Sequence, residues 1–179
     1  MMTAYDPVTG LIFLHDRRFL YSYDPARDVY TRLSSQQVSL GYHMVATIDP
    51  KRRMFVMVGY DGSNGGGRVH AYSIANGSNY SMQTLSTSGG SSLIGQLYPG
   101  LDYDPVLDRI VAWGEGSRNV VYQLNLDTRT WTATTLSNGP TPVGNGTHGR
   151  FRYSPTSGVY VLVNRVDDNA YILRLSANV

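Results

Sequence analysis

The chain has 179 residues, of which 41% are apolar and 11% aromatic, so it can bury a core and is not a disordered chain. A formal charge of +2, with basic residues scattered through turns, argues against nucleic acid as a partner. The lack of cysteine excludes a disulfide framework, a thiolate metal site and a cysteine nucleophile.

The N-terminus has neither the basic nor the apolar segment of a signal peptide, and no apolar run reaches the ~18 residues of a membrane span. We therefore expect a soluble chain without membrane contact, and the sequence leaves its compartment open. Long runs with a period of 3.6 residues are missing, whereas Tyr occurs 14 times and Gly 19 times. This balance predicts an all-β protein with little or no helix.

One unit occurs four times in chain order: an aromatic or aliphatic residue, then Asp-Pro or Ser-Pro, a turn and an apolar strand. Its turns begin at Asp6, Asp49, Asp104 and Ser154, at intervals of 43, 55 and 50 residues (6 to 49, 49 to 104, 104 to 154). This spacing is typical of the four-stranded blade of a β-propeller. Asp-Pro suits the turn because Pro presets the backbone and Asp accepts hydrogen bonds from nearby amides.

Each copy reads as an antiparallel meander within one domain, 1–179, and we place the blades at about 1–36, 42–86, 98–137 and 148–179. The expected strands are 3–5, 11–15, 19–23 and 29–33 in the first blade; 43–48, 53–59, 68–74 and 79–85 in the second; 100–103, 109–113, 119–126 and 130–136 in the third; and 150–153, 159–164 and 170–176 in the fourth.

The fourth blade therefore lacks its outer strand, and only Met1 and Met2 precede the first inner strand. The expected fold is an all-β propeller of four four-stranded antiparallel blades, incomplete in the last, as a half-propeller or a small ring. Open blade faces and an unpaired strand edge invite a partner. We expect a homodimer, which would bring eight repeats together, or a separate partner half.

The segment from Tyr122 to Trp131 has the form Tyr-x-Leu-x-x-x-Thr-x-x-Trp, which resembles the blade ends of the Kelch-like and galactose-oxidase-like propeller superfamily. The segment from His148 to Leu175 looks like the last blade of bacterial proteins of this kind. The double glycine of true Kelch repeats is mostly absent, and Gly59 and Gly114 stand singly. The resemblance implies a disc with a central channel that binds proteins or sugars and only occasionally catalyses.

Three residues share one position, six residues before the turn, in the last three repeats: His43, Tyr98 and His148. We expect them near the channel mouth, where they could bind a sugar, a carboxylate or copper, or could simply pack as amphipathic rings. The resemblance implies that a radical copper oxidase would also need a cysteine, which is absent. The sequence predicts no metal and no cofactor.

The connections between second and third strands form a second candidate site, a polar rim that could read sugar hydroxyls or an acidic partner. The alternative is turn chemistry with salt bridges between blades. The rim residues are His15, Asp16, Arg17, Arg18, Asp61, Asn64, Arg68, Glu115, Arg118, Arg165, Asp167 and Asp168.

No nucleophile motif such as Gly-x-Ser-x-Gly is present, and no pair of carboxylates stands out for glycoside cleavage. The sequence therefore favours a noncatalytic module that binds a protein or a glycan on its channel face and assembles with a second copy or a partner half. One alternative is the remnant of a propeller enzyme, either an oxidase or a polysaccharide-active enzyme. Another is a purely structural assembly subunit.

Overall fold

The computed structural model describes residues 1–116 and 118–175, and these form four antiparallel sheets, one per repeat, each a simple meander. Blade 1 comprises β1 (Met2–Tyr5), β2 (Ile12–His15), β3 (Leu20–Asp24) and β4 (Val29–Arg32). Blade 2 comprises β5 (His43–Asp49), β6 (Met54–Asp61), β7 (Gly66–Ser73) and β8 (Met82–Thr84). Blade 3 comprises β9 (Gly100–Asp104), β10 (Arg109–Trp113), β11 (Val120–Asn125) and β12 (Thr130–Thr135). Blade 4 comprises β13 (Phe151–Ser154), β14 (Val159–Val163) and β15 (Ala170–Leu173).

The predicted fold is confirmed: four small antiparallel sheets form a four-bladed propeller, and the last sheet has three strands. The strand predicted over 170–176 ends at Leu173, and Ser176 lies outside the described residues, as do 177–179. The single turn of helix α1 (Ser91–Ile94), in the connection between blades 2 and 3, agrees with the expectation of little helix.

The Asp-Pro turns repeat the same local geometry, which explains why the strands start where the sequence predicts. In the first turn, Asp6 accepts hydrogen bonds from the Val8 amide at 3.1 Å and the Thr9 hydroxyl at 2.5 Å. The last turn residue adopts the left-handed conformation in every copy, a conformation suited to Gly and costly for other residues. These residues are Gly10, Arg53, Asp108 and Gly158, with φ of 75°, 54°, 54° and 61°.

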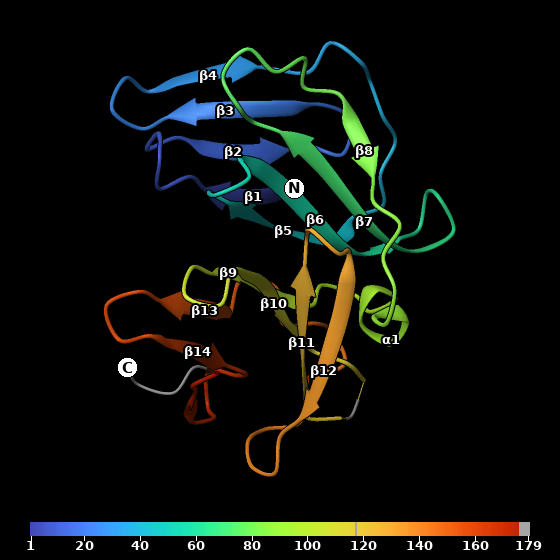
Figure 1. Ribbon diagram of the computed structural model, residues 1–179, viewed down its shortest axis with the longest axis vertical. Helices are drawn as coiled ribbons and strands as arrows, with labels where there is room; N and C mark the ends of the chain where they lie inside the picture. Colours follow the sequence, from blue (N-terminus) through green and yellow to red (C-terminus); the bar gives the residue numbers. More distant parts are fainter. Residues whose placement is uncertain (117, 176–179) are drawn as a thin grey trace.

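The blades follow one another along an arc. The inner strands β1, β5, β9 and β13 contact each other in chain order, which places each blade beside its sequence neighbours. In Figure 1, blade 1 extends toward the top and blade 4 toward the bottom, with blades 2 and 3 between them and nearer the viewer. In the described part of the chain, the inner strands of blades 1 and 4 have no contact of comparable extent, so the arc is open between these two blades.

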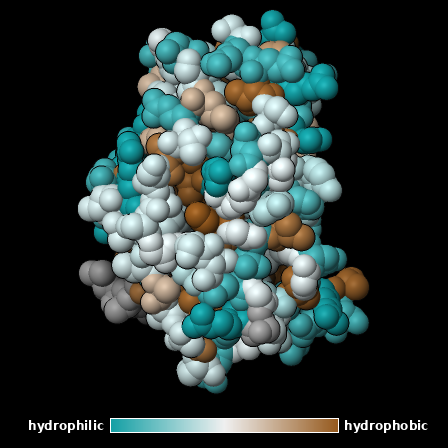
Figure 2. Space-filling view, turned by 90° about the vertical axis from the view of Figure 1, so that its right-hand side faces the viewer, coloured by the Kyte–Doolittle hydropathy of each residue, from teal (hydrophilic) through white to brown (hydrophobic). Residues whose placement is uncertain are grey.

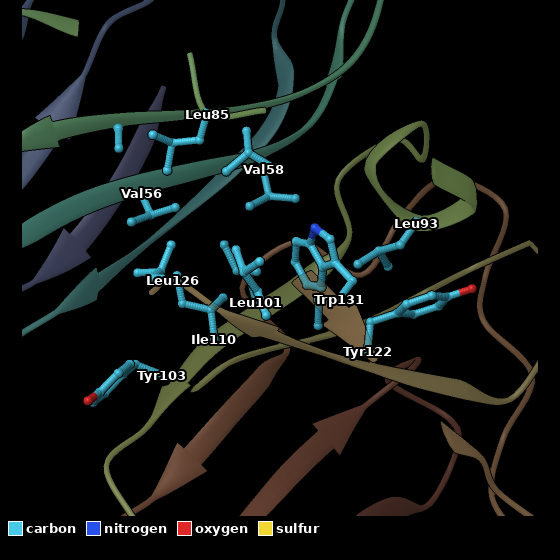
Figure 3. Close-up of a cluster of buried hydrophobic side chains, with 14 of the residues drawn as sticks. Val56, Val58, Leu85, Leu93, Leu101, Tyr103, Ile110, Tyr122, Leu126 and Trp131 are labelled. Carbon is cyan, nitrogen blue, oxygen red and sulfur yellow. The ribbon is translucent and has the colours of Figure 1, made fainter. Parts of the chain in front are cut away.

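Each junction between consecutive blades has its own hydrophobic core. Figure 3 shows the middle one, in which Val56 and Val58 of blade 2 meet Ile110 and Trp131 of blade 3. Leu93 of α1 covers one side of this cluster and is fully buried. The β-branched and aromatic residues of the repeat therefore serve mainly to stack one blade on the next.

Charged side chains reinforce the same junctions at the end of the blades that carries the Asp-Pro turns. Arg53 of blade 2 donates two hydrogen bonds of 2.7 Å to Asp6 of blade 1. Between blades 3 and 4, the Tyr160 hydroxyl lies 3.3 Å from Oδ2 of Asp104. The aspartate of the turn thus caps its own turn and holds the following blade.

Candidate functional site

The three residues that share one repeat position meet in space. The rings of His43 and Tyr98 lie edge to face with centroids 5.0 Å apart, and Tyr98 stacks on His148 at 4.1 Å. The ring of Tyr42 extends this row, because it lies 4.0 Å from His43, and the Arg17 guanidinium lies 5.5 Å from the centroid of Tyr42. We call Tyr42, His43, Tyr98 and His148 the ring stack.

Backbone hydrogen bonds between blades set the ring stack in place. The Tyr98 amide donates to the His43 carbonyl at 2.9 Å, and the His148 amide donates to the Tyr98 carbonyl at 2.9 Å. Tyr98 and His148 both have left-handed backbones, with φ of 46° and 55°. The same link thus joins blade 2 to blade 3 and blade 3 to blade 4, and it brings equivalent side chains together.

The polar atoms of the ring stack differ in their partners. Nε2 of His148 lies 3.0 Å from the Asn145 carbonyl and is engaged within its own loop. Nδ1 of His43 is buried and has no hydrogen-bond partner in residues 1–116 and 118–175. Tyr42 and His148 are exposed, so the outer rings of the stack are open to a ligand.

Two adjoining cavities follow the concave side of the arc, and Thr3 and Arg152 line both of them. The mouth cavity, of about 370 Å³, is bordered by Tyr42, Tyr98 and His148 of the ring stack. Figure 2 faces the side on which α1 lies and shows hydrophobic residues scattered among hydrophilic ones, with a group of them near the middle of the view.

The second cavity, which we call the groove, has a volume of about 610 Å³ and lies at the end of the blades that carries the Asp-Pro turns. Residues of all four blades line it, among them the four prolines of the repeat turns and one tyrosine from each of three blades. These residues are Pro7, Pro50, Pro105, Pro155, Tyr5, Tyr103 and Tyr153.

Asp102 is the acidic side chain that lines the groove among the described residues. Its Oδ1 accepts a hydrogen bond from the Thr47 hydroxyl at 3.2 Å, and its Oδ2 accepts one from the Tyr153 amide at 2.9 Å. Burial raises the pKa of the Asp102 carboxyl, against the opposing effect of these donors and of Arg152, whose Nη1 lies 4.0 Å away. Asp102 therefore joins blades 2, 3 and 4 across the groove.

The rim residues do not form one polar surface. His15 is fully buried between blades 1 and 2, where Nε2 lies 3.0 Å from the Tyr72 hydroxyl. Asp61 is also fully buried and accepts from the Gly41 amide at 2.5 Å and from Asn64 Nδ2 at 2.6 Å. These two residues hold loops and neighbouring strands in place.

The remaining rim residues form local contacts. Asp16 accepts the amides of Arg18 and Phe19, both at 2.7 Å. Glu115 is 7% exposed, accepts the Tyr122 hydroxyl and lies 3.2 Å from Nη1 of Arg118. Arg17 donates to the Leu40 carbonyl and Arg68 to the Asn64 carbonyl, both at 2.8 Å. The last three rim residues, Arg165, Asp167 and Asp168, are exposed in the β14–β15 loop.

Sequence reasoning missed three features of the site: Tyr42, the groove and the unpaired His43 nitrogen. Tyr42 precedes the aligned position by one residue. Its aromatic ring next to His43 in the sequence was the signal that could have added it to the candidate site. In the described part of the chain, no group of three or more His, Asp or Glu side chains is placed to hold a metal ion. No helix of that part is long and apolar enough to cross a membrane.

No protein-family model matches the sequence, and no curated protein matches it significantly. Among solved structures, the chain is similar to the β-propeller domain of Cps50 (Swd1) from Myceliophteria thermophila, with a TM-score of 0.53, 8% identity and coverage of 89% of this chain and 46% of that one. The chain has a β-propeller fold. Membership of the Kelch-like and galactose-oxidase-like superfamily stays a prediction.

Two larger proteins show the same similarity. TolB from Acinetobacter baumannii matches with a TM-score of 0.62 and 12% identity over 96% of this chain and 39% of its own. An auxiliary nutrient binding protein from Bacteroides thetaiotaomicron matches with a TM-score of 0.60 and 11% identity over 91% of this chain and 35% of its own. The chain thus spans less than half the length of each of the three structures.

Proposed function

We propose that this chain is a noncatalytic propeller module that binds a glycan or a segment of another protein on its concave side, and that it assembles with a second copy or a partner half. The observation that supports this most is the exposed ring stack at the mouth of a cavity that continues into a groove lined by all four blades. Concave surfaces built from successive repeats are common binding surfaces.

The side chains of the two cavities favour a glycan over a protein segment. Tyr and His rings offer an apolar face and a polar edge, and sugars present the same combination of C–H faces and hydroxyls. Asp102 and Arg152 add an acceptor and a donor within 4.0 Å of each other. A binding role also agrees with one similar structure, which is described as an auxiliary nutrient binding protein.

The enzyme alternative, a remnant of a propeller oxidase or polysaccharide-active enzyme, has less support from the cavity walls. The described residues that line the mouth include no Asp or Glu, and Asp102 is the single acid of the groove wall. Glycoside cleavage uses two carboxylates that flank the bond, and no such pair faces the groove. The purely structural alternative assigns no role to the ring stack and is separated from binding by the experiment below.

The test measures binding of a panel of soluble oligosaccharides by isothermal titration calorimetry. Tyr42→Ala removes the outermost exposed ring, and His148→Asn removes the ring at the other end while keeping a residue that tolerates the left-handed backbone. We expect each variant to raise the dissociation constant of a bound sugar by about tenfold or more, a loss of roughly 1.4 kcal/mol in binding free energy. Arg152→Ala should weaken it as well.

Gln83→Ala, an exposed position on the outer strand β8, is the matched control and should leave the affinity unchanged. Thermal unfolding of each variant checks that the fold is intact. If no oligosaccharide binds at millimolar concentration, or if the ring variants bind as the parent does, then the glycan assignment is wrong.

A further inference from the structure

Two sheet faces at the ends of the arc have no blade of the described chain stacked on them. The first face belongs to blade 1 and is formed by two cross-strand rows, Thr3, Leu14 and Tyr21 in one and Tyr5, Ile12 and Tyr23 in the other. The side of blade 1 that is packed against blade 2 carries the alternate residues, such as Met2, Ala4 and Phe13. Tyr5 on the first face is 61% exposed.

The last face belongs to blade 4 and carries Val161 opposite Ile172 and Val163 opposite Ala170. Ile172 is 73% exposed and Val163 is 40% exposed. The strand at its edge, β15, is the outermost described strand of the blade, because the sheet order is β13-β14-β15. The last face is thus aliphatic on β14 and β15 and carries Arg152 on β13, opposite Val161, and it stands at the other end of the chain from the aromatic first face.

The first face repeats, position for position, the surface with which blade 4 packs on blade 3. In blade 4 the corresponding rows are Phe151, Leu162 and Tyr171, and Tyr153, Tyr160 and Leu173, and all six belong to the core between blades 3 and 4. In blade 1 the same register positions hold Thr3, Leu14 and Tyr21, and Tyr5, Ile12 and Tyr23. Five of these six residues are aromatic or aliphatic, as in a surface built to be covered.

The last face corresponds to the surface that blade 3 presents to blade 4, which is the other half of the junction between these two blades. Blade 3 presents Val111, Trp113 and Val121 to blade 4, and these residues are buried there. The equivalent register positions of blade 4 hold Val161, Val163 and Ala170. The exposed ends of the arc therefore carry the two complementary halves of an interface that the chain already forms internally.

The polar contact between blades 3 and 4 has no counterpart at the two ends of the arc, because both of its residues are replaced there. Between blades 3 and 4, the Tyr160 hydroxyl lies 3.3 Å from the Asp104 carboxylate. At the ends of the arc, Ser154 occupies the aspartate position and Ile12 the tyrosine position. At these two positions, a junction between the ends would therefore bury neither a carboxylate without a donor nor a tyrosine hydroxyl without an acceptor.

We propose that a second copy of this chain closes the ring, with the last face of each copy packed on the first face of the other. Blades 1 and 4 extend in opposite directions from the inner strands, so a twofold axis along the channel matches both pairs of faces at once (Figure 1). The product is a closed propeller of eight blades, within the range of ring sizes that propellers adopt.

This assembly rests on the proposed function, within which it names a second copy as the partner, but it does not depend on glycan binding, and it completes the site. Thr3 of blade 1 and Arg152 of blade 4 line both cavities and stand at the two ends of the arc. In the ring, Thr3 of one copy and Arg152 of the other come to one junction. Each copy therefore supplies half of the channel wall.

The test is the mass in solution by light scattering on a size-exclusion column, without ligand, over a range of concentrations. We expect a dimer of about twice the 19.8 kDa chain. Ile172→Lys on the last face and Tyr5→Glu on the first face should each shift the protein toward monomer. Val106→Lys, at a valine that is 63% exposed in the turn of blade 3, should leave the dimer intact.

Mixing the two variants gives the decisive result. In a head-to-tail ring, an Ile172→Lys chain paired with a Tyr5→Glu chain gathers both changes into one junction with opposite charges and leaves the other junction unaltered. The mixture should therefore dimerise more strongly than either variant alone, a gain that misfolded variants could not give. Val163→Lys serves as a second variant of the last face.

Two results would overturn the proposal. One is a parent protein that stays monomeric at every concentration. A parent protein that associates only with a different protein counts as the same result. The other is a dimer that responds to changes on one face alone, because a face-to-face pairing of like blades needs only that face. The ring-stack variants should leave the mass unchanged, so a failure of glycan binding and a failure of assembly are read separately.

Discussion

Arg52 donates two parallel hydrogen bonds to Asp108, from Nη1 to Oδ1 at 2.6 Å and from Nη2 to Oδ2 at 2.8 Å, and so fastens the turn of blade 2 to the turn of blade 3. The same guanidinium also reaches Asp49 at 2.8 Å and Asp127 at 2.7 Å. Its hydrogen bonds, with those from Lys51 and Tyr103, hold the pKa of the Asp108 carboxyl well below its usual range, against the opposing effect of burial. One arginine thus bridges three carboxylates.

Arg52→Ala should lower the free energy of unfolding by about 3 kcal/mol, because it leaves the fully buried Asp49 without its counter-charge. Asp127 adds little to this figure, since its side chain is 67% exposed. Urea unfolding at neutral pH measures the change. Arg27→Ala removes an exposed pair with Asp24 and is the control, with an expected loss below about 0.5 kcal/mol. Equal losses for the two variants would contradict the assigned role of Arg52.

The stability of the protein should fall as the pH drops from 6.5 toward 4, because of His15. Burial lowers the pKa of this imidazole to about 4, an effect that His70 and the N-terminus reinforce and Asp16 opposes. The unfolded chain takes up the proton near pH 6.5 and the folded chain does not. The stabilisation is therefore complete above pH 6.5 and is lost toward pH 4, by about 3 kcal/mol in total.

Urea unfolding at several pH values between 7.5 and 4.5 tests this window. The His15→Gln variant should lose less stability over the same range, because it removes one group that must stay neutral. His70, whose pKa is also lowered by burial, accounts for part of the remaining slope. Parallel curves for the parent and the variant would show that His15 does not titrate as its burial requires.

The fold could be predicted because its main signals are local and repeated. Asp6 and Pro7 fix a turn through hydrogen bonds over two or three residues, and the apolar runs that follow such turns need only a neighbouring strand. The candidate cluster followed from the same regularity, since equivalent positions of successive blades meet around one axis. His43, Tyr98 and His148 were found for this reason, although their role in binding stays a prediction.

Other features depend on contacts between distant residues and carry no local signal. Arg52 lies 56 residues from Asp108 and 75 from Asp127, so its network appears only once the blades are stacked. His15 was assigned to the rim because it ends a strand beside charged residues, yet Tyr72, 57 residues away, covers it. Burial by a neighbouring blade decides whether such a residue is structural or available.

Asp61 offers a direct test of the structural interpretation of the rim. It accepts hydrogen bonds from the Gly41 amide, the Asn64 side chain and Nε2 of His70, the last at 3.1 Å. Asp61→Ala should cost about 2 to 4 kcal/mol in urea unfolding, because it leaves these buried donors without an acceptor. Asp167→Ala, at an exposed acid of the same candidate set, should change stability by less than about 0.5 kcal/mol. Equal effects would mean that the rim acids share one role.

Gly100, at the start of β9, tests how closely blade 4 lies against blade 3. A Cβ at this position would come within 2.6 Å of the Phe151 Cβ and within 3.0 Å of the Thr147 Cγ2. Gly100→Ala should therefore push the two blades apart and lower the free energy of unfolding by about 1 to 3 kcal/mol.

Tryptophan fluorescence gives an independent readout of this change, because Trp113 belongs to the same interblade cluster as Phe151. The matched control is Gly144→Ala, where an added Cβ meets no atom within 4 Å and the backbone is not left-handed. That substitution should leave the fluorescence unaltered and change stability by no more than about 0.5 kcal/mol. If Gly100→Ala behaves like Gly144→Ala, then blades 3 and 4 pack less tightly than the structure shows, and the junction that serves as the template for ring closure is softer than the proposal requires.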